Sequence, residues 1–147
     1  MLNLTRFGLL AVLLAAGCTD DGAAPFLGDW TYSTGEFRLD CGGQVMQFPL
    51  DTSLVETFAA GTATDLAKSD TMGCAGITFE VAGRVARLAP SPQSCTIPGM
   101  GTSTAESYTF TLGDDDRTLV AASSGTLAIP GAPGACTFTG GGTLVKP

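Results

Sequence analysis

Histidine is absent from the 147-residue chain, and basic residues are few. Without histidine, the sequence lacks the side chain that most often serves as a general base or metal ligand. Lys and Arg number 7 against 14 Asp and Glu, so the net charge is −7. A surface that binds nucleic acid needs an excess of Lys and Arg, as does electrostatic attraction to anionic lipid. The composition therefore argues against a nucleic-acid partner.

Catalytic motifs are missing as well: there is no G-x-S-x-G, S-x-x-K or H-E-x-x-H pattern and no glycine-rich phosphate loop. Acid pairs such as Glu36 and Asp40 suit glycosidase chemistry only in a cleft, about 5–9 Å apart. Both have the parity of a strand's polar face. The run Asp114–Asp116 offers carboxylates for calcium but lacks the spaced ligands of a calcium loop, so we expect a solvated hairpin tip. We predict no enzyme, no cofactor and no metal site.

Long hydrophobic runs are also lacking. Phe7–Ala16 has ten residues without a polar side chain. A membrane-spanning helix needs about 20. The run follows Arg6 and ends at Gly17, which fits a secretory signal peptide over residues 1–17. The alternative is a buried N-terminal helix, which Gly17 and the acidic stretch after it disfavour.

Cys18 stands directly after this run, in the stretch Leu14-Ala15-Ala16-Gly17-Cys18. The stretch resembles the lipobox of bacterial lipoproteins, although Ala15 stands where that family prefers Leu. The resemblance implies cleavage before Cys18, a diacylglycerol on its thiol and acylation of its amine. The alternative is an ordinary signal peptidase cut, which leaves a free thiol at the new N-terminus.

An acylated Cys18 would fasten the protein to a lipid bilayer, because two or more acyl chains give stable anchoring. Thr19 follows the cysteine. By the sorting rule of the family, this residue implies the outer membrane of a Gram-negative bacterium. We therefore expect a cell-envelope protein with a signal peptide at 1–17, a lipidated cysteine and flexible tether at 18–26, and one domain at 27–147.

Four further cysteines lie in this domain: Cys41, Cys74, Cys95 and Cys136. An even number of cysteines in an exported chain predicts two disulfides, with three possible connectivities. A metal site is disfavoured because no two of these cysteines have C-x-x-C spacing and histidine is missing.

Short alternating runs separated by Gly, Asp and Pro predict an all-β domain. We expect about eight strands in a single antiparallel up-and-down barrel or barrel-like sandwich, stapled by disulfides. The expected strands cover 28–41, 44–58, 63–68, a hairpin over 75–90, 104–112, 117–129 and 136–145. A bulge is expected near Gly35, and a bulge or an unpaired edge at Pro49.

The clearest hairpin has Ala82-Gly83 as its expected turn. Ile77, Phe79 and Val81 then share one face. If the loop has two residues, Val81 lies opposite Arg84.

Strand directions place all four domain cysteines at one end of such a barrel. In a closed barrel the last strand lies beside the first, and the fourth beside the fifth. This arrangement favours Cys41–Cys136 and Cys74–Cys95, with Cys41–Cys74 and Cys95–Cys136 as the alternative.

Gly28-Asp29-Trp30 resembles the G-x-W that opens the first strand of lipocalins and related barrels. The resemblance implies a tryptophan that plugs the closed end under an arginine from the last strand, but no arginine follows Arg117. The alternative is an ordinary core tryptophan near a strand start.

The pattern as a whole resembles small cysteine-containing lipoproteins of the myxobacterial type, to which no function is attached. The likeness rests on the lipobox, the G-x-W and the stretches 40–43, 73–83 and 136–144. Two roles remain open. One is a non-enzymatic module that binds a small apolar ligand, and the other is an envelope interaction protein or hydrolase inhibitor. An apolar cavity of about 300 Å³ or more would favour the ligand. A lumen filled by Trp30, Phe79, Tyr108, Phe110 and Phe138 would favour surface contact.

Overall fold

The computed structural model describes residues 22–70 and 74–147, and these residues form an all-β domain. Cys18 and the expected signal peptide at 1–17 lie outside the described residues. The strands are β1 (Gly28–Cys41), β2 (Gln44–Pro49), β3 (Val55–Ala60), β4 (Leu66–Asp70), β5 (Ala75–Ala82), β6 (Val85–Leu88), β7 (Gln93–Ile97), β8 (Gly101–Leu112), β9 (Thr118–Ala128) and β10 (Cys136–Val145). A 3₁₀ turn, η1 (Ala24–Phe26), precedes them. Within the described ranges, no helix is long and apolar enough to cross a bilayer.

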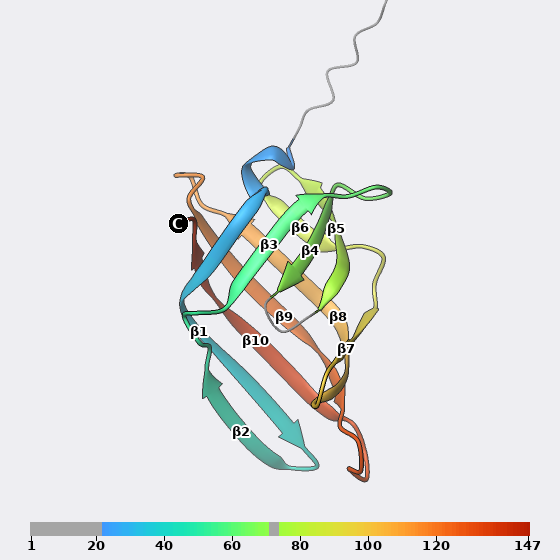
Figure 1. Cartoon of the computed structure of the whole chain (residues 1–147). Helices are drawn as coiled ribbons and strands as arrows, with labels where there is room; N and C mark the ends of the chain where they lie inside the picture. Colours follow the sequence, from blue (N-terminus) through green and yellow to red (C-terminus); the bar gives the residue numbers. More distant parts are fainter. Residues whose placement is uncertain (1–21, 71–73) are drawn as a thin grey trace, which may run out of the picture.

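Eight of the strands close into an antiparallel barrel (Figure 1). Around the ring the order is β1, β3, β4, β5, β6, β8, β9 and β10, and β10 pairs with β1 to complete it. The predicted antiparallel barrel of about eight strands is therefore confirmed.

The two additional strands make the barrel different at its two ends. β1 pairs with β3 from Gly28 to Thr31 and then with β2 from Glu36 to Cys41. In the same way β8 pairs with β7 at its start and with β6 nearer its end. One end is thus an eight-stranded ring, here called the closed half. The other is a curved sheet in the order β2–β1–β10–β9–β8–β7, here called the open half, which lies at the bottom of Figure 1.

The strand expected over residues 44–58 is in fact two strands, β2 and β3. β2 ends at Pro49 on the edge of the sheet, where a missing N–H breaks no ladder. The chain then turns, with the Asp51 carboxylate accepting a hydrogen bond from the Ser53 N–H at 2.8 Å. The edge position expected for Pro49 is confirmed, and the turn after it moves the chain from the open half to the closed half.

Two further details differ from the sequence prediction. β7 was not expected at all. In the β5–β6 hairpin Ala82 pairs with Val85, so the two-residue turn is Gly83-Arg84, one position later than predicted. Gly83 has φ +59, a left-handed conformation that glycine adopts without strain. The bulge expected near Gly35 is confirmed, since the pairing of β1 with β10 is irregular between Tyr32 and Thr34.

The closed half contains the main hydrophobic core. Its largest side chains are fully buried, and the rings of Phe58, Phe79 and Phe110 meet edge to face with centroids 4.9–6.1 Å apart. Such aromatic contacts add stability beyond the area that they bury. This half therefore has the packing of an ordinary protein interior. The other large core residues are Phe26, Trp30, Leu66, Leu119 and Leu144.

The chain before β1 closes this end of the barrel. Phe26 is fully buried, and its carbonyl accepts a hydrogen bond from the Trp30 indole N–H at 2.7 Å. Residues 22–26, which the sequence analysis assigned to a tether, are thus partly packed, because Phe26 belongs to the core. The N-terminal end of the described domain lies at the closed half, at the top of Figure 1.

Candidate functional site

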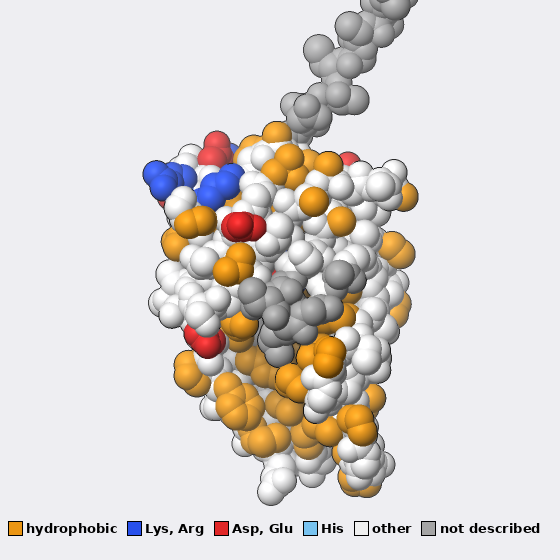
Figure 2. Space-filling view, in the orientation of Figure 1, with side chains coloured by type: hydrophobic (Ala, Val, Ile, Leu, Met, Phe, Trp, Pro, Cys, Tyr) orange, Lys and Arg blue, Asp and Glu red, His pale blue; other side chains and the backbone are white. Residues whose placement is uncertain are grey.

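The open half encloses a cavity of about 740 Å³. Its wall comes from the inner faces of the long strands and from β2 and β7, and most of the lining side chains are apolar. Figure 2 shows hydrophobic side chains gathered over the lower part of the molecule, with most of the visible charges in the upper part. The described lining includes Phe37, Leu39, Leu50, Leu54, Ile77, Ile97, Leu127 and Phe138.

A group of four polar side chains lies where the cavity meets the core of the closed half. We call Tyr32, Glu56, Lys68 and Tyr108 the floor cluster, and all four line the cavity. The Lys68 ammonium forms an ion pair with Glu56 Oε2. Both tyrosine hydroxyls donate to Glu56 Oε1, at 3.2 Å from Tyr32 and 3.3 Å from Tyr108. One carboxylate is therefore held by a cation and two hydroxyl groups.

The two charges of the floor cluster are buried, with Glu56 6% exposed and Lys68 3% exposed. Lys68 Nζ also lies 5.3 Å from the centroid of the Tyr108 ring, close enough for a cation–π contact. Buried ion pairs contribute little net stability, because removing two charges from water offsets most of their attraction. The pair is thus poorly explained by folding alone, and its position against a cavity suggests a role in that cavity.

Strand parity brings these side chains together. Glu56 shares a face of β3 with Phe58, and Lys68 shares a face of β4 with Leu66. Phe58 pairs with Lys68 across the two strands, so Glu56 and Lys68 are diagonal neighbours on the inner face. The sequence analysis missed this pair. The signal was available, since two adjacent strands each carry one charge of opposite sign at an apolar position.

Tyr108 has a pKa raised well above its usual value of 10.0. The first cause is burial, which removes the phenolate from water, and the second is the negative charge of nearby Glu56. The Tyr108 ring faces the cavity and is only partly buried, while its hydroxyl meets Glu56. The hydroxyl therefore stays protonated at neutral pH and remains a hydrogen-bond donor.

Gln93 is a second residue of the cavity wall that the sequence analysis missed. Its side-chain amide accepts from the Thr78 N–H at 2.9 Å and donates to the Thr78 carbonyl at 2.9 Å. The amide thus satisfies the backbone of β5 as a neighbouring strand would. This contact fixes the start of β7 against the barrel and seals the wall between β5 and β7.

The mouth of the cavity is apolar. Met46, Phe48, Met100 and Ile129 line the cavity and are 36–46% exposed, and we call these four residues the rim. Contiguous exposed apolar surface on a soluble domain commonly marks a binding site. The cavity thus has its buried ion pair at the floor and apolar side chains at the rim.

Both disulfides lie in the open half. Cys41 bonds to Cys136 and joins the end of β1 to the start of β10, while Cys74, directly before β5, bonds to Cys95 in β7. The pairing favoured from strand directions is confirmed. Because Cys74 and Cys95 line the cavity, the second disulfide is part of its wall.

Trp30 is fully buried in the closed half, and the ammonium group of Lys146 lies over its ring. Lys146, just after β10, lies with Nζ 5.0 Å from the ring centroid and donates to the Pro25 carbonyl at 3.1 Å. The sequence analysis found no arginine for this place. A lysine supplies the charge instead, and it ties the last strand to η1.

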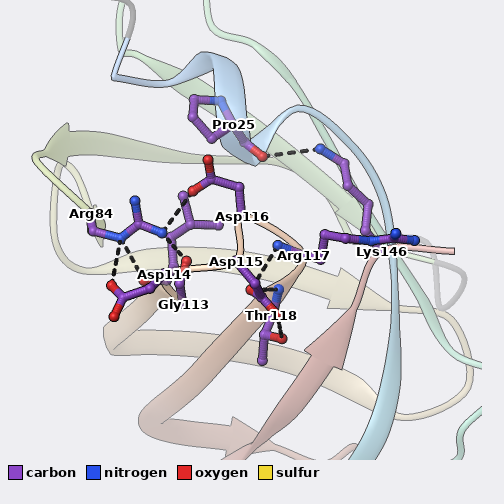
Figure 3. A network of polar contacts seen from close by, with 10 residues as sticks. Pro25, Arg84, Gly113, Asp114, Asp115, Asp116, Arg117, Thr118 and Lys146 are labelled. Atoms are coloured by element: carbon purple, nitrogen blue, oxygen red, sulfur yellow. Dashed lines mark hydrogen bonds and ion pairs between the residues drawn. The ribbon is translucent and has the colours of Figure 1, made fainter.

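The acidic run Asp114–Asp116 forms the β8–β9 turn, as expected for a hairpin tip (Figure 3). The Asp115 carboxylate accepts from the N–H groups of Arg117 and Thr118, which lowers the pKa of that carboxyl. Arg84 donates to the Gly113 carbonyl and to Asp116. These carboxylates hold turns together.

Among the residues that the structure describes, no group of three or more His, Cys, Asp and Glu is arranged to hold a metal ion. Glu36 is exposed and accepts from the Gln47 amide at 3.0 Å, while Asp40 accepts from the Gly43 N–H at 2.9 Å. Both therefore act in the β1–β2 hairpin rather than in the cavity.

The barrel lumen is partly filled and partly hollow. Trp30, Phe79 and Phe110 fill the closed half as predicted for a packed lumen. Tyr108 and Phe138, which were grouped with them, line the cavity instead. The cavity exceeds the size of about 300 Å³ that separates a ligand site from a packed interior. Comparisons of the chain with protein families, with curated proteins and with solved structures found no match.

Proposed function

We propose that the protein is a non-enzymatic module that binds one small apolar ligand in the open half of its barrel. The observation that carries the proposal is an apolar cavity of about 740 Å³ with a few convergent polar groups at its floor. Ligand sites in proteins typically have about 300–1,000 Å³ and a mostly apolar wall with a small number of polar groups.

We further propose that the chain is exported and anchored in the envelope, in the outer membrane, through acylated Cys18. The lipobox-like stretch before Cys18 supports this, and so do the two disulfides, since such bonds persist in oxidising compartments. The residues that line the cavity belong mostly to the open half, and the N-terminal end of the described domain lies at the closed half, so an anchor on the N-terminal side would leave the rim accessible.

A neutral fluorescent probe tests the ligand site. We expect N-phenyl-1-naphthylamine to bind the purified domain saturably, with one probe per chain and increased fluorescence. Ser123→Phe adds a ring at a position that lines the cavity, whereas Ala122→Phe adds the same ring to the exposed outer face of β9. The first variant should weaken binding about tenfold or more and the second should not, because the added ring competes for cavity volume.

Equal binding by the two variants, or no binding by the wild type, would contradict the proposal. In that case the exposed rim would favour the alternative role, contact with another envelope protein. Native mass spectrometry of the protein purified from its host provides an independent check, with a bound small molecule as the expected result.

Lipidation is tested separately. Labelled palmitate should enter the wild-type protein and should not enter Cys18→Ser. The matched control is Thr19→Ser, which leaves the cysteine in place and should be labelled normally. Equal labelling of wild type and Cys18→Ser would contradict the anchor and leave the cavity proposal untouched.

A further inference from the structure

The cavity has an unusual distribution of polarity, which bears on the kind of ligand that fits. The rim is apolar, and the floor cluster lies at the deep end. A pocket that accepts a molecule tail first would carry its polar groups at the mouth. Here the floor cluster offers the head of an amphipathic ligand the largest group of polar partners, so a ligand that enters head first reaches them.

Charge at the floor restricts that head. The described lining residues that carry charge are Asp51, Glu56 and Lys68. Asp51 is exposed and caps its own turn through Ser53, whereas Glu56 and Lys68 are buried against each other. A ligand carboxylate at the floor would compete with Glu56 for Lys68 and would leave one of two carboxylates poorly compensated. A ligand ammonium would meet Lys68 in the same way.

An uncharged head avoids both penalties. The Tyr108 hydroxyl donates to Glu56, and its oxygen keeps the capacity to accept a hydrogen bond. A hydroxyl or amide group on the ligand supplies such a donor without bringing a charge into the interior. Burying an unpaired charge costs far more than burying a hydrogen-bonded neutral group.

We infer that the site selects apolar ligands with an uncharged, hydrogen-bonding head, such as a long-chain alcohol or amide, over fatty acids and alkyl amines. This inference rests on the proposed function and names the ligand class of the same site. The floor pair serves as the selecting element because each of its charges is matched inside the protein.

Displacement of the naphthylamine probe by three compounds of equal chain length tests the inference. Dodecanol, dodecanoate and dodecylammonium are compared in about 0.15 M salt. This salt concentration screens the repulsion of dodecanoate and the attraction of dodecylammonium by the acidic protein surface. We expect dodecanol to displace the probe at a concentration about tenfold or more below that of either charged compound. Displacement by dodecanoate at an equal or lower concentration would overturn the inference while the bound probe still supports the ligand site. Equal displacement by all three, as for a head left in water at the mouth, would overturn it too.

Altering the floor charge sharpens the test. Glu56→Gln removes one negative charge beside Lys68, so dodecanoate should gain about tenfold relative to dodecanol. The control Glu36→Gln removes the same charge from the exposed face and should leave the preference unchanged. Unchanged preference in a folded Glu56→Gln protein would overturn the inference. If thermal unfolding shows that this variant does not fold, the wild-type comparison still decides.

Discussion

The two halves of this barrel share four strands but are stabilised in different ways. In the closed half, large side chains such as Trp30, Phe58 and Phe110 are fully buried and leave little space. In the open half the buried cluster is small, comprising Leu39, Leu127, Cys136 and Phe138 beside the cavity. All four cysteines of the described chain form their disulfides in this half.

The difference teaches how a small domain keeps a cavity. A hollow interior forgoes the contacts that normally stabilise a fold, because wall atoms have no partners on the cavity side. Covalent cross-links instead restrict the unfolded chain and do not require a filled interior. Packing therefore stabilises one half, and disulfides stabilise the other without filling its cavity.

Removal of the Cys41–Cys136 bond should have the largest effect on stability. The double variant Cys41→Ala/Cys136→Ala frees a loop of 95 residues, which predicts a loss of about 4–5 kcal/mol in the free energy of unfolding. The variant Cys74→Ala/Cys95→Ala frees only 21 residues and should lose about 3 kcal/mol. Urea unfolding of both variants measures the difference. A larger loss from the shorter loop would contradict this account of the open half.

Truncation of Trp30 in the closed half should lower the free energy of unfolding by nearly as much. Trp30→Ala removes a fully buried ring and its hydrogen bond to Phe26, for an expected loss of about 3–5 kcal/mol. Probe binding by the folded fraction should change little, because Trp30 does not line the cavity. If the variant stays as stable as wild type but no longer binds the probe, then the closed half does not contribute to stability independently of probe binding in the open half.

A smaller effect is expected at the boundary between the halves, at high pH. The chain has two tyrosines, so Tyr32→Phe leaves Tyr108 as the only phenol. Its raised folded pKa means that the unfolded state loses its proton first, near pH 10, so stability falls as pH rises above that value.

The difference in stability between Tyr32→Phe and Tyr32→Phe/Tyr108→Phe isolates this contribution. It should shift by about 1.4 kcal/mol between pH 9 and pH 11. Absorbance at 295 nm should show no phenolate in the folded protein near pH 10. Ionisation of folded Tyr108 at the usual pH would show that its hydroxyl is open to water.

Truncation at the rim should have the smallest effect on folding. Phe48 is 46% exposed on the edge strand β2, so Phe48→Ala should change the free energy of unfolding by less than about 0.5 kcal/mol. Probe affinity should nonetheless fall severalfold, because the ring lines the mouth. Val120→Ala, which shortens an exposed side chain on β9 outside the lining, serves as the control and should alter neither quantity.

The sequence predicted the barrel and both disulfides because those features follow from local periodicity and strand direction. Alternation placed Ile77 and Phe79 on the inner face, and both are buried. The sequence did not reveal that residues 44–58 form two strands rather than one. A proline at position 49 is compatible with a bulge inside one strand and equally with a turn between two strands. That error did not scatter the cysteines, because β2 and β3 both run antiparallel to β1. In the same way β6 and β7 both run antiparallel to β8, so neither break in the expected strands adds a reversal of the chain.

The cavity was harder to predict than the wall around it. Whether an inward side chain fills space or lines it depends on the partner across the barrel, which alternation does not report. Tyr108 and Phe138 have the same parity as core residues, yet they face a hollow. The charges at Glu56 and Lys68 departed from the apolar pattern, and two such departures on neighbouring strands are the sign to look for.

The unbroken length of β1, β8, β9 and β10 has a consequence for the proposed ligand site. Each strand begins or ends in the tightly packed ring and continues as cavity wall, so the wall is braced at one end before any ligand arrives. A preorganised site requires little ordering when it is occupied, and less binding energy is lost to entropy. Substitutions that fit the cavity to a differently shaped ligand would then occur in β2, β7 and the loops at the entrance. These segments lie outside the eight-stranded ring, so such substitutions would leave its packing unchanged.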